Sequence, residues 1–304
     1  MGNSSDNHLR KDKNICIKPG EAVKLSGYET DYTAGFINKE DAAQKLAADI
    51  ETLKDLQDKL YASRRYALLI VFQAMDAAGK DSTIKHVMSG INPQGCDVIS
   101  FKQPGFDDLS HDFLWRIHKE CPAKGKIGIF NRSHYEEVLV TKVHPEYILG
   151  ENIRGIDSVD KIDKDFWDRR YKRINSFEKI LYDSGTMVVK FFLHLSKKEQ
   201  KKRFLKRIDQ PQKNWKFSAA DLKERALWDD YQKAYEDAIS NTSTEYAPWY
   251  IIPADNKWFM RAAVGDILAG TLEDMNLKYP KISDDGRIAL QKAKDELMAE
   301  KNDD

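Results

Sequence analysis

Short apolar runs alternate with longer stretches of helical periodicity between residues 40 and 275. The apolar runs predict buried strands at residues 66–72, 97–101, 126–130, 187–195 and 249–252. Apolar residues spaced by three or four predict a helix at 40–62, and further helices are expected near 80–89, 108–120, 166–183, 219–240 and 256–275. Strands that alternate with helices indicate an α/β fold, in which helices cover both faces of a parallel sheet.

The chain is expected to form one main domain with an extension at each end. Residues 1–37 are polar and interrupted by glycines, which predicts a surface extension with little regular structure. Residues 38–285 contain the alternating elements, and no linker rich in Pro, Gly or Ser divides them. Residues 286–304 are rich in charge and predict a C-terminal helix, near 287–300, and a tail.

Composition excludes several classes of protein. The 304 residues include 49 basic and 49 acidic side chains, so no overall field attracts the chain to nucleic acid or membrane. Cys16, Cys96 and Cys121 share no metal-binding spacing and are expected to be reduced thiols. No apolar run approaches the length of a membrane span, and no secretion signal opens the chain. We therefore expect a cytoplasmic protein without nucleic-acid or membrane partners.

The first predicted buried strand is followed by the clearest chemical signal. A tight loop at residues 74–79 ends in Gly79, and Lys80 then opens a helix. In such a strand–loop–helix, backbone N–H groups bind phosphate oxygens and a lysine reaches the outer phosphates. Two positions depart from the usual pattern, because Ala74 replaces a glycine and Asp81 replaces a magnesium-binding hydroxyl.

Asp76 is the unusual residue inside this loop. A carboxylate beside phosphates is repulsive unless a divalent cation lies between them, so Asp76 is a candidate Mg²⁺ ligand. Gly79 permits close approach of the backbone to a phosphate, and Lys80 supplies a positive charge. The alternative is an ordinary strand–turn–helix whose charged residues are solvated.

A second motif occupies residues 128–137. A short strand ends in Asn131 and Arg132, at the edge where parallel α/β sheets bind their ligands. An arginine there can bind a transferring phosphoryl group through two hydrogen bonds. Because an arginine at a strand end is more often a surface ion-pair partner, this interpretation depends on its pairing with the loop at 74–79.

A dense basic run lies at residues 197–207, where seven of eleven residues are Lys or Arg. Arg203, Lys206 and Arg207 share one helical face, and Lys213 and Lys216 follow. So many like charges repel one another unless an anion neutralises them, which favours an anion-binding lid. A solvated basic face is the alternative.

The seven histidines show no metal-binding spacing. His134 follows Arg132 closely and suggests a phosphorylated intermediate. Transfer between two phosphates needs no covalent intermediate, however, so a structural role is the favoured interpretation.

Taken together, four segments resemble the polyphosphate kinase 2 family. They span nearly the whole region from about residue 40 to residue 275. The segments are Asp76-Ala77-Ala78-Gly79-Lys80, Phe130-Asn131-Arg132-Ser133-His134-Tyr135, the basic run with Trp215-Lys216-Phe217-Ser218, and Ala247-Pro248-Trp249-Tyr250-Ile251-Ile252-Pro253-Ala254-Asp255-Asn256-Lys257.

The resemblance implies a three-layer α/β/α P-loop kinase fold with a central parallel sheet and a helical lid at about residues 197–217. It also implies reversible transfer of a terminal phosphoryl group between inorganic polyphosphate and a nucleotide, with Mg²⁺ or alternatively Mn²⁺. Asn131 with Glu136 and Glu137 resembles the subgroup that accepts both nucleoside mono- and diphosphates, so AMP and GMP are expected besides ADP and GDP. A homo-oligomer, dimer or tetramer, is also expected.

By the same resemblance, Asp76, Lys80 and Arg132 are expected to be catalytic, and Asp76 to hold the metal. Asn131 is a second candidate metal ligand, although a neutral amide binds a hard cation more weakly than the Asp that many members carry there. The residues expected to bind polyphosphate or nucleotide are Ala77, Ala78, Gly79, Asp81, Ser82, Asn131, His134, Glu137, Arg203, Arg207 and Lys216.

Two other functions are compatible with the same motifs. An ATP-dependent kinase of a nucleotide or small metabolite would share the phosphate loop but would be indifferent to polyphosphate. A polyanion-binding nucleotide switch would use the basic helices to bind nucleic acid. The sequence shows no basic and aromatic residues interleaved as in an RNA-binding module, which disfavours the switch.

Overall fold

Six strands form one sheet within residues 9–300, the part of the chain that the computed structural model describes. Their spatial order is β1-β6-β5-β2-β4-β3; β1 is antiparallel to β6, and all other neighbours are parallel. The strands are β1 (Cys16–Ile17), β2 (Ala67–Gln73), β3 (Cys96–Ser100), β4 (Ile127–Asn131), β5 (Thr186–His194) and β6 (Trp249–Pro253). The five predicted strands are confirmed, each within one residue at either end.

The helices account for most of the remaining chain. They are α1 (Lys39–Ser63), α2 (Lys80–Val87), α3 (Phe106–Leu109), α4 (Trp115–Lys119), α5 (Glu136–Val143), α6 (Lys164–Asp183), α7 (Lys197–Ile208), α8 (Ala219–Ala226), α9 (Trp228–Thr242), α10 (Lys257–Asp274) and α11 (Asp284–Ala299). Short 3-10 helices occupy Leu9–Lys11, Leu25–Gly27, Pro93–Gly95, Pro145–Glu151, Val159–Lys161 and Pro211–Lys216.

Two predicted helices are interrupted, and α5 was not predicted. The expected helix near 108–120 is two short helices, because the Asp112 carboxylate accepts the backbone N–H of Leu114 (3.0 Å) and competes with helical pairing. The expected helix at 219–240 breaks at Leu227, whose ψ of 26° ends α8 before α9 begins.

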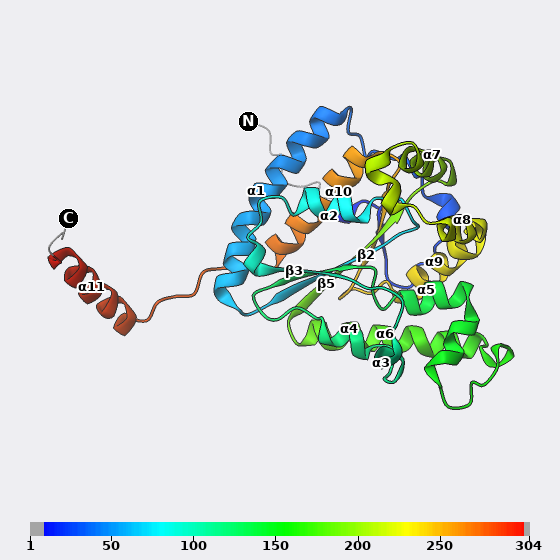
Figure 1. Ribbon diagram of the computed structural model, residues 1–304. Helices are drawn as coiled ribbons and strands as arrows, with labels where there is room; N and C mark the ends of the chain where they lie inside the picture. The colour runs from blue at the N-terminus through cyan, green and yellow to red at the C-terminus, as the bar shows by residue number, and fades with distance from the viewer. Residues whose placement is uncertain (1–8, 301–304) are drawn as a thin grey trace.

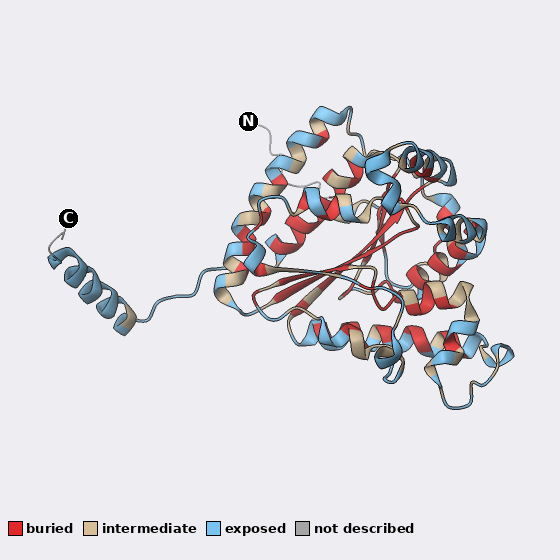
Figure 2. Cartoon of the chain, viewed as in Figure 1, coloured by how far each residue is buried: buried red, intermediate tan, exposed pale blue. Residues whose placement is uncertain are grey.

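The helices form two layers around the sheet, as Figure 1 shows. Side chains of β2 alternate between them, since Leu68, Ile70 and Phe72 pack with α1, α2 and α10. Leu69 and Val71 instead pack with α5, α6 and α9. Every residue of β2 is buried, and Figure 2 shows the buried residues concentrated on the sheet and on the helix faces that cover it. The three-layer α/β architecture is therefore confirmed.

The register of β2 and β4 fixes the position of the two loops that follow these strands. Phe72 lies opposite Asn131, and the backbone N–H of Arg132 donates to the carbonyl of Phe72 at 3.0 Å. The carboxyl ends of both strands therefore meet at one edge of the sheet, where α/β proteins bind their ligands.

The chain segments at the two ends differ in how they join this core. The N-terminal segment has only short elements, yet Ile15 and Ile17 are fully buried and β1 pairs with β6. At the other end, α11 has no buried residue and projects from the body of the molecule (Figure 1). Among helices between residues 9 and 300, none combines the length and apolar character that a membrane crossing requires.

A fully buried polar network joins β5 to α6. The Nζ of Lys190 donates to Glu178 Oε2 (2.6 Å), to Tyr135 Oη (2.9 Å) and to the carbonyl of Thr242 (2.7 Å). Glu178 Oε1 accepts from Tyr135 Oη (2.8 Å) and pairs with His134 Nε2 (3.2 Å). Each buried charge thus has an opposite charge and hydrogen bonds to offset its desolvation.

We predict that Glu178→Gln destabilises the protein by about 3–5 kcal/mol, because it leaves the Lys190 ammonium buried without a counter-charge. Urea denaturation measures the change. The matched control is Asp168→Asn on the same helix, which removes an exposed pair with Lys164 and should leave the midpoint unchanged. Equal midpoints for the two variants would contradict the role of the network.

Candidate functional site

The loop between β2 and α2 turns sharply because two of its residues adopt left-handed backbone conformations. Gly79 has φ 113°, where a side chain would be strained, and an added Cβ would lie 3.2 Å from Met260 Cε. Ala77 has φ 65° without the freedom of glycine, which costs about 1 kcal/mol or more. The rest of the structure must therefore hold this loop in shape.

Lys80 opens α2 with its ammonium folded back over this loop. Its Nζ donates to the carbonyl oxygen of Ala74 at 3.0 Å. Burial, followed by the positive charge of Arg132, lowers the pKa of Lys80 below its ordinary value. A bound phosphate would supply the negative charge that stabilises the ammonium form in this position.

The side chain of Arg203, on α7, holds the loop from behind and is 7% exposed. Its guanidinium donates to four backbone carbonyls, those of Ala77 (3.1 Å), Ala78 (2.7 Å), Ala254 (2.6 Å) and Asp255 (3.1 Å). Its Nε donates to Glu199 Oε1 at 3.0 Å, so all five N–H donors are used. Arg203 therefore joins the loops after β2 and β6, and has no donor left for a phosphate in this arrangement.

Arg132 brings the loop after β4 against the loop after β2. Its Nη2 donates to Asp76 Oδ1 at 3.0 Å, and its Nη1 lies 3.5 Å from Glu136 Oε2. Arg132 also adopts a left-handed backbone conformation, with φ 65°. Strained residues of this kind cluster at functional sites, where the surrounding structure fixes a side chain in a required direction.

A second contact joins the same two loops. Asn131 Nδ2 donates to Asp81 Oδ1 at 2.8 Å, and Lys216 Nζ lies 3.7 Å from Asp81 Oδ2. Burial opposes ionisation of Asp81, but the Asn131 hydrogen bond and the charges of Lys216 and Lys80 outweigh it and lower its pKa. Asp81, in the first turn of α2, therefore contacts both the end of β4 and the 3-10 helix that ends at Lys216.

Two cavities meet these loops on different sides. We call the first the basic cleft; its volume is about 280 Å³, and it is lined by Ala77, Gly79, Asp81, Ser82, Arg203, Lys206, Arg207, Lys213, Lys216 and Lys257. We call the second the wide pocket; its volume is about 590 Å³, and its lining includes Asp76, Lys102, Arg116, Arg132, Glu136, Glu137, Asp221 and Glu224. The cleft is cationic apart from Asp81, whereas the pocket lining carries seven carboxylates and three Lys or Arg side chains.

Glu137 lies at the wall of the wide pocket and is nearly buried. Its Oε1 accepts from Arg116 Nη2 at 3.0 Å, and Arg170 Nη1 donates to its backbone carbonyl at 3.2 Å. Burial, followed by the charge of Glu151, raises the pKa of Glu137 to about 7 although both arginines oppose the shift. Near neutral pH, a small change in the charge around Glu137 would therefore alter the fraction of its carboxyl group that is protonated.

The structure brings most of the sequence-predicted site residues together, and His134 is the exception. Asp76, Lys80, Asp81, Asn131 and Arg132 gather at the ends of β2 and β4, while Ala77, Gly79, Ser82, Arg207 and Lys216 line the basic cleft. Ala78 lies buried in the loop and reaches Arg203 through its carbonyl. His134 is fully buried against Glu178 and reaches neither cavity, since its side chain points into the interior toward α6.

Three residues of this region were given no binding or catalytic role from the sequence. Gln200 donates to the carbonyl of Asp76 at 2.9 Å, Glu136 accepts from Arg132, and Lys257 lines the basic cleft. A signal for Lys257 was available, because it opens a helix directly after another buried strand, the arrangement that also places Lys80. The bond of Gln200 spans 124 residues of sequence, which no local pattern reveals.

A metal ion would have few protein ligands here. Within the described part of the chain, no group of three or more His, Cys, Asp or Glu side chains could hold a metal ion. Asp76 offers a partly exposed carboxylate at the mouth of the phosphate loop. That arrangement fits Mg²⁺, which is commonly bound by one or two carboxylates together with substrate phosphates and water.

Comparisons with known proteins agree on one family. The family model described as Polyphosphate kinase 2 (PPK2) matches residues 36–280. The chain is 49% identical to the ADP-polyphosphate phosphotransferase of Rhodopseudomonas palustris, over 95% of this chain and 99% of that protein. It is 44% identical to the AMP/ADP-polyphosphate phosphotransferase of Meiothermus ruber, over 88% of this chain and 96% of that protein.

A solved structure extends the similarity to the fold. Polyphosphate Kinase 2 from Arthrobacter aurescens TC1 superimposes with a TM-score of 0.79 at 42% identity, over 88% of this chain and 91% of that one. The matched region contains both strand-end loops, the basic helix α7 and the strand β6. The chain belongs to the polyphosphate kinase 2 family.

Proposed function

We propose that this protein is a polyphosphate:nucleotide phosphotransferase, which reversibly transfers the terminal phosphoryl group of inorganic polyphosphate to ADP and GDP, and also to AMP and GMP. The observation that carries the proposal is the Asp76–Arg132 pair, which lines the wide pocket while Ala77, the next residue of the loop, lines the basic cleft. The names of the R. palustris and M. ruber relatives specify ADP and AMP/ADP as nucleotides.

The basic cleft suits the polyphosphate donor. Lys206, Arg207, Lys213, Lys216 and Lys257 all line it, so a chain with a negative charge on each phosphate would be attracted along its length. Cations of this kind reduce the repulsion between donor and acceptor, which is the main electrostatic obstacle to their reaction. We propose that the helix α7 and the 3-10 helix at Pro211–Lys216 act as the lid over this chain.

The wide pocket suits the nucleotide acceptor. Its volume of about 590 Å³ lies in the range of small-molecule sites, and it opens beside Asp76 and Arg132. Lys102 and Arg116 lie at its wall and would attract acceptor phosphates, while Arg116 Nη2 also donates to Glu137 Oε1 at 3.0 Å. Asn131 and Glu137, which suggested the use of monophosphates, lie at the strand end and the pocket wall respectively.

The reaction needs charge neutralisation more than proton transfer. A terminal phosphate oxygen of the nucleotide, ionised at neutral pH, forms a bond to the terminal phosphorus of polyphosphate. The bond from that phosphorus to the bridging oxygen breaks, and the polymer leaves one phosphate shorter. No general base is required. Lys80 and Arg132 would stabilise the charge that develops on the phosphoryl oxygens.

A divalent cation is part of the proposal. Asp76 would hold Mg²⁺, or Mn²⁺ in its place, together with phosphate oxygens and water, and Asn131 is a weaker second candidate. When bound, the ion would neutralise charge on the phosphates. The carboxylate of Asp76 is positioned by Arg132 and by the Gln200 hydrogen bond to its backbone.

The direct test supplies long-chain polyphosphate, Mg²⁺ and either ADP or AMP, and measures ATP by luminescence. We expect ATP from ADP, and from AMP after two successive transfers. An enzyme that needs ATP and ignores polyphosphate would contradict the proposal, as would nucleic-acid binding without turnover.

We predict that Lys80→Ala lowers kcat by about 10²-fold or more, because it removes a cation from the phosphoryl oxygens at the transition state. Steady-state kinetics with saturating ADP and polyphosphate measure the loss. The control is Lys172→Ala, an exposed lysine of α6 on the opposite layer. Near-normal turnover in a folded Lys80→Ala variant would contradict the phosphate-binding role proposed for this loop.

A pH dependence follows from Lys257. Burial, followed by the charges of Arg203, Arg261 and Lys206, lowers its pKa to about 8, although Glu199 opposes the shift. Its ammonium is therefore present below pH 8 and lost above it. We expect kcat/KM for polyphosphate to fall about 10-fold between pH 7 and pH 9.

The matched variants for this prediction are Lys257→Arg and Lys257→Gln. The arginine stays charged and should abolish the decline, since its pKa lies far above this range. The glutamine should lower kcat/KM at pH 7 and leave little pH dependence near 8. A decline near pH 8 that persists in the arginine variant would assign it to another group.

A further inference from the structure

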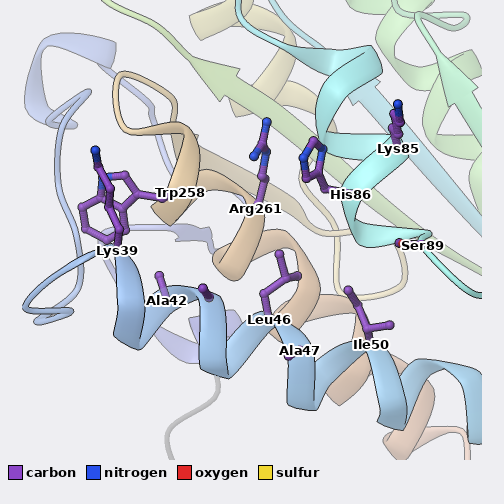
Figure 3. Close-up of a pocket in the computed structure, with 11 residues that line it drawn as sticks. Lys39, Ala42, Leu46, Ala47, Ile50, Lys85, His86, Ser89, Trp258 and Arg261 are labelled. Carbon is purple, nitrogen blue, oxygen red and sulfur yellow. The ribbon is translucent and has the colours of Figure 1, made fainter.

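A groove on the far side of α2 and α10 from the wide pocket is not used by the proposed reaction. It lies between these helices and α1 and has a volume of about 470 Å³ (Figure 3). The residues that line it are Lys39, Ala42, Ala43, Leu46, Ala47, Ile50, Lys85, His86, Ser89, Trp258 and Arg261. Its lining therefore includes four nitrogen-bearing side chains that are or can become cationic, and no acidic side chain.

Among residues 9–300, no Asp or Glu side chain forms an ion pair with any of these four side chains, although the chain as a whole has equal numbers of acidic and basic residues. The Nε of Arg261 is buried and has no hydrogen-bond partner. His86 uses Nδ1 on the carbonyl of Ser82 at 2.6 Å, which leaves Nε2 available to a ligand. Lys39, Lys85 and His86 are exposed to solvent, but like charges gathered on one groove still repel one another, and a bound anion would relieve that repulsion.

The apolar part of the groove strengthens this field. Ala42, Leu46, Ala47 and Ile50 project from α1 into the groove, as Figure 3 shows. A wall of low polarisability focuses field lines from neighbouring charges, so an anion is attracted more strongly than at a fully solvated basic surface.

The groove continues the basic cleft along two helices. On α10, Lys257 lines the cleft, and Arg261 lines the groove one turn later. On α2, Ser82 lines the cleft, and His86 lines the groove one turn later. Figure 3 shows the nitrogen-bearing ends of Lys39, Arg261, His86 and Lys85 following one another across these helices.

We propose that this groove binds distal phosphates of a long polyphosphate chain whose reacting end occupies the basic cleft. The inference rests on the proposed function. A linear polymer with a charge on every phosphate can meet a row of cations that begins in the cleft and continues one helical turn further. A nucleotide carries its charges at one end only and would leave part of the row unpaired. The groove thus favours long chains over short ones.

The test compares long polyphosphate with tripolyphosphate, which has too few phosphates to occupy the cleft and the whole row of groove cations together. The variant is the triple substitution Lys39→Gln, Lys85→Gln and Arg261→Gln. The control removes the same charge from the exposed face of α6 through Arg169→Gln, Lys172→Gln and Arg173→Gln. We expect KM for long polyphosphate to rise about 10-fold or more in the groove variant only, with KM for the short chain and kcat unchanged.

Binding of long polyphosphate without nucleotide, followed by calorimetry at several salt concentrations, gives a second readout. The logarithm of affinity should fall less steeply with the logarithm of salt in the groove variant, since fewer counterions are released. Unchanged KM for long chains, or an equal rise for both lengths, would overturn the inference. If the wild-type protein makes no ATP from polyphosphate, the proposed function itself fails, which is a distinct result.

Discussion

The alignment of β2 with β4 is the constraint on which the site depends. Because Phe72 lies opposite Asn131 and accepts the N–H of Arg132, the loops after both strands emerge side by side. This proximity allows the Asp76–Arg132 contact at 3.0 Å. The basic cleft and the wide pocket then open on either side of these loops. A shift of the register between β2 and β4 would move Asp76 away from Arg132, and would move the basic cleft relative to the wide pocket.

Strain in these loops is balanced by contacts from distant parts of the chain. Ala77 and Arg132 both adopt left-handed conformations without being glycine. Arg203 uses all its donors to hold the first loop and tie it to the segment after β6, and Gln200 adds a bond to Asp76. A basic helix can thus serve two purposes, since Arg203 positions the loop while Lys206 and Arg207 line the basic cleft.

The sequence predicts the elements well and the roles of individual side chains less well. The strands and the phosphate loop are recognisable because apolar periodicity and the Gly79–Lys80 pair are local patterns. The hydrogen bonds of Arg203 to backbone carbonyls cannot be recognised from the sequence, because the partners lie up to 126 residues away. His134 lies two residues after Arg132 in sequence, but its side chain faces the interior, where it pairs with Glu178 of the buried Glu178–Lys190 pair.

The central claim is that both substrates are bound together and that the phosphoryl group passes directly between them. The stereochemical course at phosphorus tests this most directly, by use of a donor whose transferred group is a chiral, isotopically labelled thiophosphoryl. One in-line displacement inverts the configuration, so direct transfer beside Asp76, Lys80 and Arg132 predicts inversion. Retention would indicate two displacements through a phosphorylated side chain and would contradict direct transfer.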